Sequence, residues 1–533
     1  MSSYTELFES KTTPQSSPIP GREPEMVKNY AGGYTFQIDA EAQLKRFLIL
    51  GADSATYYAS AQKMTADNSQ VVMEYAAHEP AKCAGIIADI SKSGRAMRND
   101  AAIFALALMA ERVSPESRMH AFAHVNQVCR TGSMFMLFNR YLEDLGGKSN
   151  RSRRTMITNW YKNRDAGQIA YQSLKYRNRY GWKPQDLINV GHVITDNADS
   201  NRVIEYLMTG RIPDGKNEQI VFGFEEINEA KTEKEVVAAI DKYKLTWEFV
   251  PSRWLESNTV WETLLPNMPY TATIRNLGQL TARGIIAQNS DAAKWVCNKL
   301  NTAEYLRYSR VHPFTILVAQ RIYMQGQGMR GSKSWNPVSM VTDALEDAFY
   351  SAFDYVEPSG KSYFFGIDAS GSVGMQVSQH IPMAVGEAEA VMAMVAARTE
   401  KNSVTEAFAS GRVLNLNITR HDSLHSAVEK MRMHMVGSTD LAAPMKYSRD
   451  MGLDIDCFVI MTDNETWSGS RHPVQELAKY REWKKDPNVG MIVAAFTSTG
   501  FSIADPTDPR NLDIVGMDTQ TPQLISSFGR GEW

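Results

Sequence analysis

Two spacing patterns of apolar residues predict helices in the first two-thirds of the chain. Ala101–Arg112 is apolar almost all round, which is typical of a helix buried among its neighbours. From Ala166 to Leu174, apolar or small residues recur at intervals of three and four, which predicts an amphipathic helix. No alternating strand pattern persists before about residue 356. We therefore expect a mostly α-helical region, compatible with stacked helical repeats although no fixed repeat period is evident.

The pattern changes at the turn Glu357–Gly360. Short apolar runs follow it, and we interpret them as strands: Tyr363–Asp368, Val404–Ala409, Cys457–Asp463 and Met491–Thr497. Helix-like stretches separate these runs: Ile381–Thr399, Ser423–Met435 and Val474–Trp483. Strands that alternate with helices indicate parallel βαβ units and hence a doubly wound α/β domain with a Rossmann-like sheet.

Length and local composition then divide the chain. The 533 residues are enough for several domains. Residues 1–25 are rich in Ser, Thr and Pro and poor in apolar residues, so we expect a flexible tail there. We assign residues 26–359 to the helical region and residues 360–533 to the α/β domain.

Composition excludes several classes of protein. Hydrophobic residues make up 43% and charged residues 22% of the chain, which is typical of a globular protein with large cores. The longest apolar run is about half a membrane span. No basic stretch followed by an apolar one opens the sequence, so we expect no secretory signal. The cysteines Cys83, Cys129, Cys297 and Cys457 lie far apart, as expected of reduced thiols in a cytoplasmic protein.

Charge is concentrated in one segment. The whole chain has a net charge of −3. Lys148–Lys183, by contrast, contains ten Lys or Arg and one acid, Asp165, which gives this segment a net charge of +9. If one helix spans Lys175 and Arg179, both cations face away from the apolar stripe that begins at Ala166. The alternative is an ordinary solvated helix face, but such faces mix both signs of charge. Aromatic residues that could stack on unpaired bases interleave with these cations: Trp160, Tyr161, Tyr171, Tyr176, Tyr180 and Trp182.

A second candidate site follows the first strand of the α/β domain. Asp368, Ser370 and Ser372 form a D-x-S-x-S turn at the carboxyl end of that strand, where open parallel sheets bind ligands. Thr439 and Asp463 lie in two later loops that would reach the same edge. Three hydroxyls and two carboxylates suit a divalent cation, above all Mg²⁺, with Mn²⁺ or Ca²⁺ as alternatives. In the alternative interpretation, without a metal, Asp368 and the serines only cap the next helix.

We find no convincing catalytic set. A phosphatase that forms a phosphoaspartate usually needs a second acid two residues after its nucleophile, and Ser370 stands there. Neither a P-loop nor an HExxH motif occurs. We therefore expect a binding protein rather than an enzyme.

The metal-site turn resembles the metal-ion-dependent adhesion site of von Willebrand factor A domains. By that resemblance Ser370, Ser372 and Thr439 coordinate the metal directly, and Asp368 and Asp463 do so directly or through water.

The chain from about Met26 onward resembles the Ro ribonucleoprotein family, which comprises the sixty-kilodalton Ro autoantigen and its bacterial relatives. The resemblance rests on the D-x-S-x-S turn and on several long stretches in the same order: Leu44–Tyr58, Lys175–His192, Met268–Thr281, Val311–Arg330, Met461–Trp467 and Thr497–Pro506. It implies a TROVE module of HEAT-like helical repeats that forms a monomeric ring, completed by the A domain.

The resemblance also implies a function. Proteins of this family bind Y RNA on the outside of the ring, and Lys175, Arg179 and His192 stand at family positions that contact it. Single-stranded ends of misfolded noncoding RNA enter the central hole. Bacterial members act in RNA quality control as adaptors, with polynucleotide phosphorylase tethered by a Y RNA.

Further contacts are nominated on charge alone. Arg151, Arg153 and Arg154 are extra candidates for the outer surface. For the hole we nominate Arg275, Arg283 and Arg330. Two other functions remain open: a metal-dependent protein-interaction scaffold that acts through the A domain without RNA, and a metal-dependent RNA-processing enzyme.

Overall fold

The computed structural model describes most of the chain. The described residues are 12–29, 31–37, 39–50, 61–93, 99–214, 218–309, 311, 313–328, 333–352, 358–369, 376–378, 381–400, 402–416, 418–419, 422–433, 437–462, 468–495, 501–515 and 521–531.

The apolar runs after residue 360 form a parallel sheet. The described strands of this sheet lie in the order β11-β9-β8-β3-β6-β7, and all neighbours are parallel except β6 and β7. Their bounds are β3 Ser362–Asp368, β6 Asn402–Ala409, β7 Arg412–Leu414, β8 Cys457–Thr462, β9 Gly490–Ala495 and β11 Asn511–Val515. The four predicted strands are confirmed because β3, β8 and β9 are almost fully buried, as continuous apolar runs require, and β6 is half-buried beside them.

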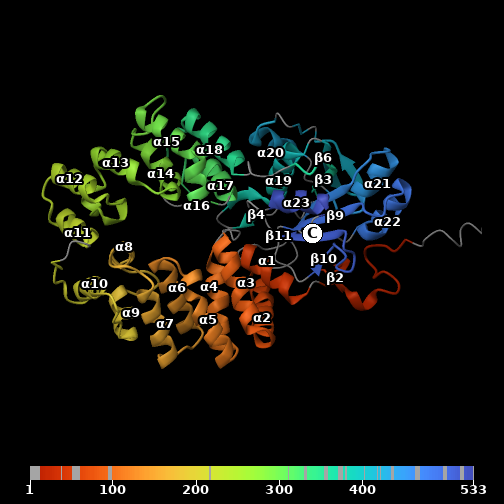
Figure 1. The fold of residues 1–533 in the computed structure, drawn as a ribbon. Coiled ribbons are helices and arrows are strands. Elements are labelled where there is room, and N and C mark those ends of the chain that lie inside the picture. The colour runs from red at the N-terminus through yellow and green to blue at the C-terminus, as the bar shows by residue number, and fades with distance from the viewer. Residues whose placement is uncertain are drawn as a thin grey trace, which may run out of the picture.

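Helices cover both faces of this sheet, as a doubly wound domain requires (Figure 1). They are α19 Val385–Thr399, α20 Leu424–Arg432, α21 Ala443–Asp450, α22 Pro473–Lys484 and α23 Thr521–Arg530. The prediction of one helix over Ile381–Thr399 is wrong at its start. Ile381–Ala384 is strand β5, which pairs with β4 (Gln376–Ser378), so the helix begins four residues later.

The chain before this domain is helical, as predicted. Its α-helices are α1 Ala40–Leu50, α2 Ala61–His78, α3 Pro80–Ser93, α4 Asp100–Arg112, α5 Pro115–Val128, α6 Gly132–Asp144, α7 Arg151–Lys162, α8 Ala166–Lys175, α9 Pro184–Gly191, α10 Ala198–Thr209, α11 Gln219–Glu229, α12 Glu233–Tyr243, α13 Asn258–Leu264, α14 Tyr270–Ala282, α15 Asp291–Asn301, α16 Ala303–Ser309, α17 Pro313–Met324 and α18 Ser339–Ser351. Short 3-10 helices lie at Glu23–Glu25, Trp247–Phe249, Ser252–Trp254 and Leu265–Asn267.

Burial follows the sequence pattern in two of these helices. In α4, every residue from Ala101 to Ala110 except Phe104 is buried, because the helix packs against α2, α3, α5 and α6. In α8, the buried residues are those of the predicted stripe, Ala166, Ile169, Ala170, Ser173 and Leu174. Apolar spacing therefore predicted which helix faces pack inward.

The helices run out from the α/β domain and return to it. In Figure 1 the orange helices α2–α7 form one arm, α8–α12 make the turn, and the green helices α13–α18 form the second arm. In this view α14, α16 and α17 lie on the side of their arm that faces α4 and α6. Both ends of this path contact the α/β domain, α1 at β11 and α17 at β5. The helical region and the α/β domain thus form a closed ring.

One closing contact is a buried ion pair. The Arg46 guanidinium, on α1, is fully buried and pairs with Asp513 of β11, with Nε 3.0 Å from Oδ2. It also donates to the Phe501 carbonyl at 3.0 Å. A guanidinium that holds a carboxylate bidentately fixes both direction and distance. This contact attaches the first helix to the edge strand of the sheet.

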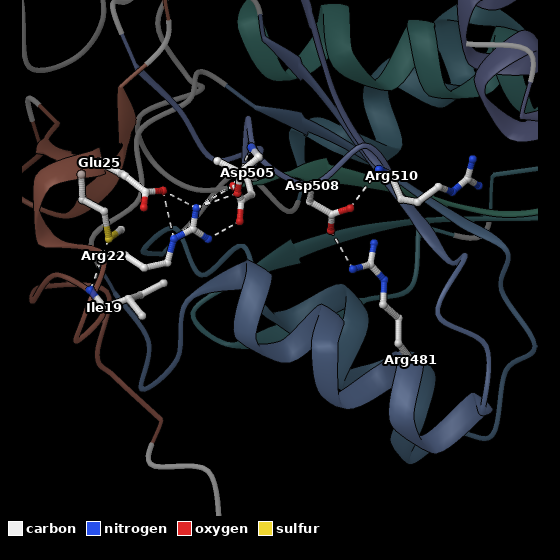
Figure 2. Close-up of polar contacts among 9 residues, drawn as sticks. Ile19, Arg22, Glu25, Arg481, Asp505, Asp508 and Arg510 are labelled. Carbon is white, nitrogen blue, oxygen red and sulfur yellow. Dashed lines mark hydrogen bonds and ion pairs between the residues drawn. The ribbon is translucent and has the colours of Figure 1, made fainter.

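The prediction of a flexible tail is wrong for residues 12–25. Figure 2 shows Arg22 between Glu25 and Asp505, paired with both carboxylates. Gln15 is fully buried, and its side chain donates to the Asp440 carboxylate at 2.9 Å. The segment continues into β1 (Met26–Lys28) and β2 (Tyr34–Gln37), which form a sheet with β10 (Phe501–Ser502). Polar contacts, which hydrophobic patterning does not reveal, hold this segment on the α/β domain.

The thiols are free, as predicted, and Cys83, Cys129 and Cys457 are buried. Among the described residues no helix has the length and apolar character needed to cross a bilayer.

Candidate nucleic-acid interface and metal site

The basic segment is divided among two helices and a turn. Asn150 begins α7 by accepting the Arg153 amide at 2.9 Å, and Asp165 and Gln168 form a capping box at the start of α8. The condition that one helix spans Lys175 and Arg179 is not met, because α8 ends at Lys175.

The residues Arg179–Trp182 form a tight turn. Arg179 and Trp182 exchange backbone hydrogen bonds of 3.0 and 2.9 Å. Between them, Tyr180 and Gly181 both have positive φ, 55° and 80°, as in the two-residue turns of hairpins. Tyr180 is 48% exposed at the tip of this turn, whereas Trp160, Tyr161 and Trp182 are buried.

Packing brings the turn, α7 and α9 together. The Arg153 guanidinium lies 5.6 Å from the ring of Trp182, and α9 begins two residues after this tryptophan. At the other end of α9, Thr158 on α7 donates to the Gly191 carbonyl at 3.1 Å. Gly191 is required there, because a Cβ atom would lie 2.6 Å from Ile157. Residues near both ends of α9 therefore lie against α7.

Three arginines and one histidine on these elements face solvent. Arg151 and Arg154 on α7, Arg179 in the turn and His192 after α9 are all exposed. Among the described residues, no carboxylate forms an ion pair with any of these four side chains. We call Arg151, Arg154, Arg179 and His192 the basic surface. Its positive charge is thus available to an external anion.

Two predicted contacts are placed differently. Arg153 is 3% exposed, and burial lowers its pKa; it donates to Asn139 on α6, so the expectation of a surface cation is not met. Lys175 is half-buried. Its ammonium lies 3.1 Å from Glu248 and 3.0 Å from the Tyr171 hydroxyl. Burial lowers the pKa of Lys175, but this hydroxyl and the charges around it raise the pKa overall.

The described part of the predicted metal site lies at the carboxyl edge of the sheet. Asp368 ends β3, is fully buried and accepts the Thr462 hydroxyl at 2.9 Å. Ser410, next after β6, donates its amide to the Ser438 carbonyl at 2.7 Å, which brings the loop of Thr439 to the same edge. Thr439 is 2% exposed.

This donor set fits a hard cation in part. A buried carboxylate with threonine hydroxyls at the same edge supplies only oxygen ligands, which Mg²⁺ prefers. The other predicted ligands, Ser370, Ser372 and Asp463, lie outside the described residues. Within the part of the chain that the structure describes, no three His, Cys, Asp or Glu side chains gather around one point.

The three arginines predicted to contact RNA in the central hole of the ring differ in their surroundings. Arg275 on α14 is exposed. Arg283 is held by the carbonyl and carboxylate of Glu256, at 3.0 and 3.2 Å. Arg330 lies outside the described residues. Next to Arg275 a cavity opens that also includes Lys333 and Trp335, and no periodicity in the sequence marks these two residues.

Comparison with known proteins agrees with this architecture. The chain matches the TROVE domain family over residues 27–235 and 240–322, and the Ro60 vWA domain family over residues 362–529. It is 35% identical to the RNA-binding protein RO60 of Deinococcus radiodurans over 95% of this chain and 96% of that one. It is 30% identical to the RNA-binding protein RO60 of Caenorhabditis elegans, over 95% and 90% of the two chains.

A solved structure confirms the fold. The crystal structure of the Deinococcus radiodurans RO (RSR) protein superposes with a TM-score of 0.71 at 34% identity, covering 93% of this chain and all of that one. The chain therefore belongs to the Ro60 family, in which a TROVE domain precedes a vWA domain.

Proposed function

We propose that this protein binds RNA, and that the basic surface holds a structured small RNA of the Y RNA type. The observation that carries the proposal is the set of exposed arginines on α7 and in the Arg179–Trp182 turn, with His192 after α9, which have no acidic partner among the described residues. Phosphates neutralise such cations and release counterions. The Ro60 relatives are named as RNA-binding proteins, which supports the same function.

Tyr180 adds a contact of a different kind. Its ring stands at the tip of the turn, directly after Arg179. Every base has a flat face, so an exposed aromatic ring beside cations stacks on an unpaired base while the cations hold the backbone. We propose this role for Tyr180 in a loop or bulge of the bound RNA.

The experiment is a titration of a fluorescent stem-loop RNA with the full-length protein. Arg179→Ala/His192→Ala is expected to weaken binding by tenfold or more. The matched control is Lys162→Ala, since that exposed lysine is already neutralised by Asp196 at 3.0 Å, and binding should stay within twofold of wild type. Equal affinity of all three proteins would place the RNA elsewhere, and no binding by wild type would refute the proposal.

We further propose that the protein is a non-catalytic adaptor in the quality control or decay of noncoding RNA. In this proposal single-stranded ends enter the ring, and polynucleotide phosphorylase joins through the Y RNA in the cytoplasm. Pull-down of that nuclease by the tagged protein should require the stem-loop RNA and disappear with Arg179→Ala/His192→Ala. Release of nucleotides by the protein alone would contradict the non-catalytic role.

The vWA domain is proposed to hold Mg²⁺ through Asp368, Ser370, Ser372, Thr439 and Asp463. The buried Asp368 carboxylate and the neighbouring hydroxyls support this proposal. A bound ion would supply a positive charge that attracts a carboxylate or phosphate oxygen. Added Mg²⁺ should raise the Tm of wild type and leave the Tm of Asp368→Asn unchanged. A Tm of wild type that is indifferent to Mg²⁺, Mn²⁺ and Ca²⁺ would contradict a metal site.

A further inference from the structure

A cavity of about 310 Å³ lies among the helices α8, α9, α10 and α11. In Figure 1 these helices belong to the turn between the two arms of the ring, and α8 packs against both α10 and α11. Two of the lining residues, Arg177 and Lys183, flank the Arg179–Trp182 turn, so the cavity adjoins the basic surface. Its volume is at the lower end of the range for small-molecule pockets, which suits a single small ligand.

The walls of this cavity are largely apolar. Leu174, Pro184 and Leu207 line it and are buried, and they contribute aliphatic surface. The ring of Phe224 on α11 also lines it. Apolar walls hold the faces of a flat group but do not orient it, so the polar groups of the lining decide which ligand fits.

One of these polar groups is a carboxylate with an open oxygen atom. Glu225 on α11 is partly buried, and its Oε1 accepts a hydrogen bond from the Tyr206 hydroxyl. Burial and the Glu225 carboxylate raise the pKa of Tyr206, so the hydroxyl keeps its proton and orients the carboxylate. Among the described residues no cation pairs with Glu225, and no donor reaches its Oε2. The carboxylate is therefore fixed and able to accept N–H donors from a ligand.

Two other lining residues are exposed cations. Arg177 donates to the Glu248 carbonyl at 3.3 Å, and its guanidinium lies 5.1 Å from the centre of the Phe224 ring. Lys183 is exposed immediately before α9. In the part of the chain that the structure describes, neither cation has a carboxylate partner. The cavity thus offers a hydrogen-bond acceptor and two positive charges to the same ligand.

We propose that this cavity binds a guanosine phosphate, with the N1–H and N2–H groups of the base donating to Glu225 and the phosphate at Arg177 and Lys183. Guanine alone among the four bases carries two adjacent N–H donors on its pairing edge, which match the two acceptor oxygens of a carboxylate. Adenine and cytosine place an acceptor nitrogen beside the amino group, and uracil places its single N–H between two carbonyls. These acceptors repel a carboxylate.

Charge favours the nucleotide over a peptide. An arginine side chain of a partner protein also carries paired N–H donors, but its positive charge would face Arg177 and Lys183. Guanosine phosphate is neutral at the base and negative at the phosphate. It comes from one of two sources: a free nucleotide, or an unpaired guanosine of an RNA on the basic surface. The second source rests on the proposed RNA-binding function and adds base recognition to it.

The first experiment titrates the full-length protein with GMP that carries a fluorescent methylanthraniloyl group on its ribose. Unlabelled GMP should displace this probe at an about tenfold lower concentration than AMP or IMP, because AMP lacks the paired donors and IMP lacks the N2 amine. Lys183→Ala should weaken the binding of GMP several-fold. The same variant should leave the binding of guanosine unchanged, because guanosine has no phosphate.

Glu225→Gln tests the role of the carboxylate. Glutamine keeps an oxygen that accepts from Tyr206, so the packing of α10 and α11 is preserved. The variant should bind GMP about tenfold more weakly and lose the preference for GMP over AMP. If the carboxylate only repelled the phosphate, the same variant would bind GMP more tightly. The matched control is Glu226→Gln, since the next carboxylate on α11 is paired with Lys242 at 3.0 Å, and it should bind GMP like wild type.

A stem-loop RNA with one unpaired guanosine, compared with the same RNA carrying adenosine at that position, identifies the source. Displacement of the probe by the guanosine RNA but not by the adenosine RNA, lost in Glu225→Gln, supports an RNA guanosine. Displacement by GMP and by neither RNA supports a free nucleotide.

Four results would overturn the guanosine cavity: no binding of the probe by wild type, equal displacement by GMP and AMP, unchanged GMP affinity in Glu225→Gln, or displacement by an arginine peptide alone. Failure of wild type to bind either stem-loop RNA, with GMP binding intact, has a different meaning. It would refute the proposed RNA-binding function and leave the cavity as a site for a free nucleotide.

Discussion

Lys299, on α15, is a buried cation held by neutral groups. It is 5% exposed, donates a hydrogen bond to the Met268 carbonyl, and lies 4.6 Å from the ring of Trp295. Removal of an ammonium from water disfavours its charged form, so burial lowers the pKa of Lys299 to about 8.

This pKa predicts a pH dependence of stability. Between about pH 8 and the ordinary lysine value near 10.5, the unfolded chain keeps the proton that the folded chain has released, so the free energy of unfolding rises with pH. Relative to Lys299→Met, wild type should gain up to about 3 kcal/mol over this range. Denaturant titrations at several pH values measure the difference. Parallel curves for the two proteins would contradict the lowered pKa.

At the residue scale, the sequence predicted the charge of the basic segment but not the surroundings of each cation. Arg153 and Arg154 are neighbours in the same run, yet one is buried under Asn139 and the other faces solvent. The angular position of each residue around the axis of α7 decides which arginine is buried. That position depends on where the Asn150 cap begins the helix. Lys175 is paired with Glu248, which lies in a distant part of the chain, so no local pattern could reveal that partner.

At the element scale, the N-terminal segment illustrates stabilisation by polar contacts. Arg22 donates to Asp505 at 2.8 Å (Figure 2). It also donates to Thr507 at 3.0 Å, and its guanidinium lies 4.5 Å from the ring of Phe36. Asp505 is 7% exposed and therefore depends on this partner. The Arg22 guanidinium holds the pKa of Asp505 below its usual range, although burial opposes this shift.

Arg22→Ala is expected to lower the free energy of unfolding by about 2 kcal/mol, because it leaves the buried Asp505 carboxylate without its cation. Hydrogen exchange of the amides in β1 and β2 should accelerate as well. Arg211→Ala is the control, since Arg211 forms an exposed pair with Glu205, and it should cost less than about 0.5 kcal/mol. Equal stability of the two variants would show that Arg22 does not fix the segment.

The major strands and helices were predictable because burial imposes a period on the sequence. The exceptions are elements built by pairing with distant residues. β10 is only two residues long and is a strand because it pairs with β2. The sequence of Ile381–Ala384 predicts part of a helix, whereas in the structure this segment pairs with Gln376–Ser378 as a strand. At the proposed metal site, the sequence predicted Asp368 at the end of β3, and the structure agrees.

At the scale of the whole molecule, the ring depends on a few contacts at its junctions. The Arg46–Asp513 pair joins α1 to β11, and Ser502 also donates to Asp513, at 2.7 Å. Arg46 and Asp513 lie near opposite ends of the chain. The complete burial of Arg46 on the first helix is therefore understood only from the folded ring, which brings Asp513 to it.

Arg46→Ala should destabilise the protein by about 3–5 kcal/mol, because it leaves Asp513 without its cation in a mostly buried site. Calorimetry should then show the helical region and the vWA domain unfolding in separate transitions. The comparison is Arg140→Ala, which removes an exposed pair with Asp144 within α6. Should Arg46→Ala unfold at the same temperature as Arg140→Ala, the junction would not depend on this pair.

The salt dependence of RNA affinity tests the central claim most directly. The affinity for a stem-loop RNA should be measured over a salt series for wild type and for Arg151→Ala/Arg154→Ala/Arg179→Ala. If these exposed cations neutralise phosphates, the slope of log affinity against log salt should become shallower by about 0.9 for each phosphate that is no longer neutralised, hence by about 2–3 in the variant. Removal of three paired cations, Arg140, Lys162 and Lys242, should leave the slope unchanged. Identical slopes for wild type and the basic-surface variant would contradict the account.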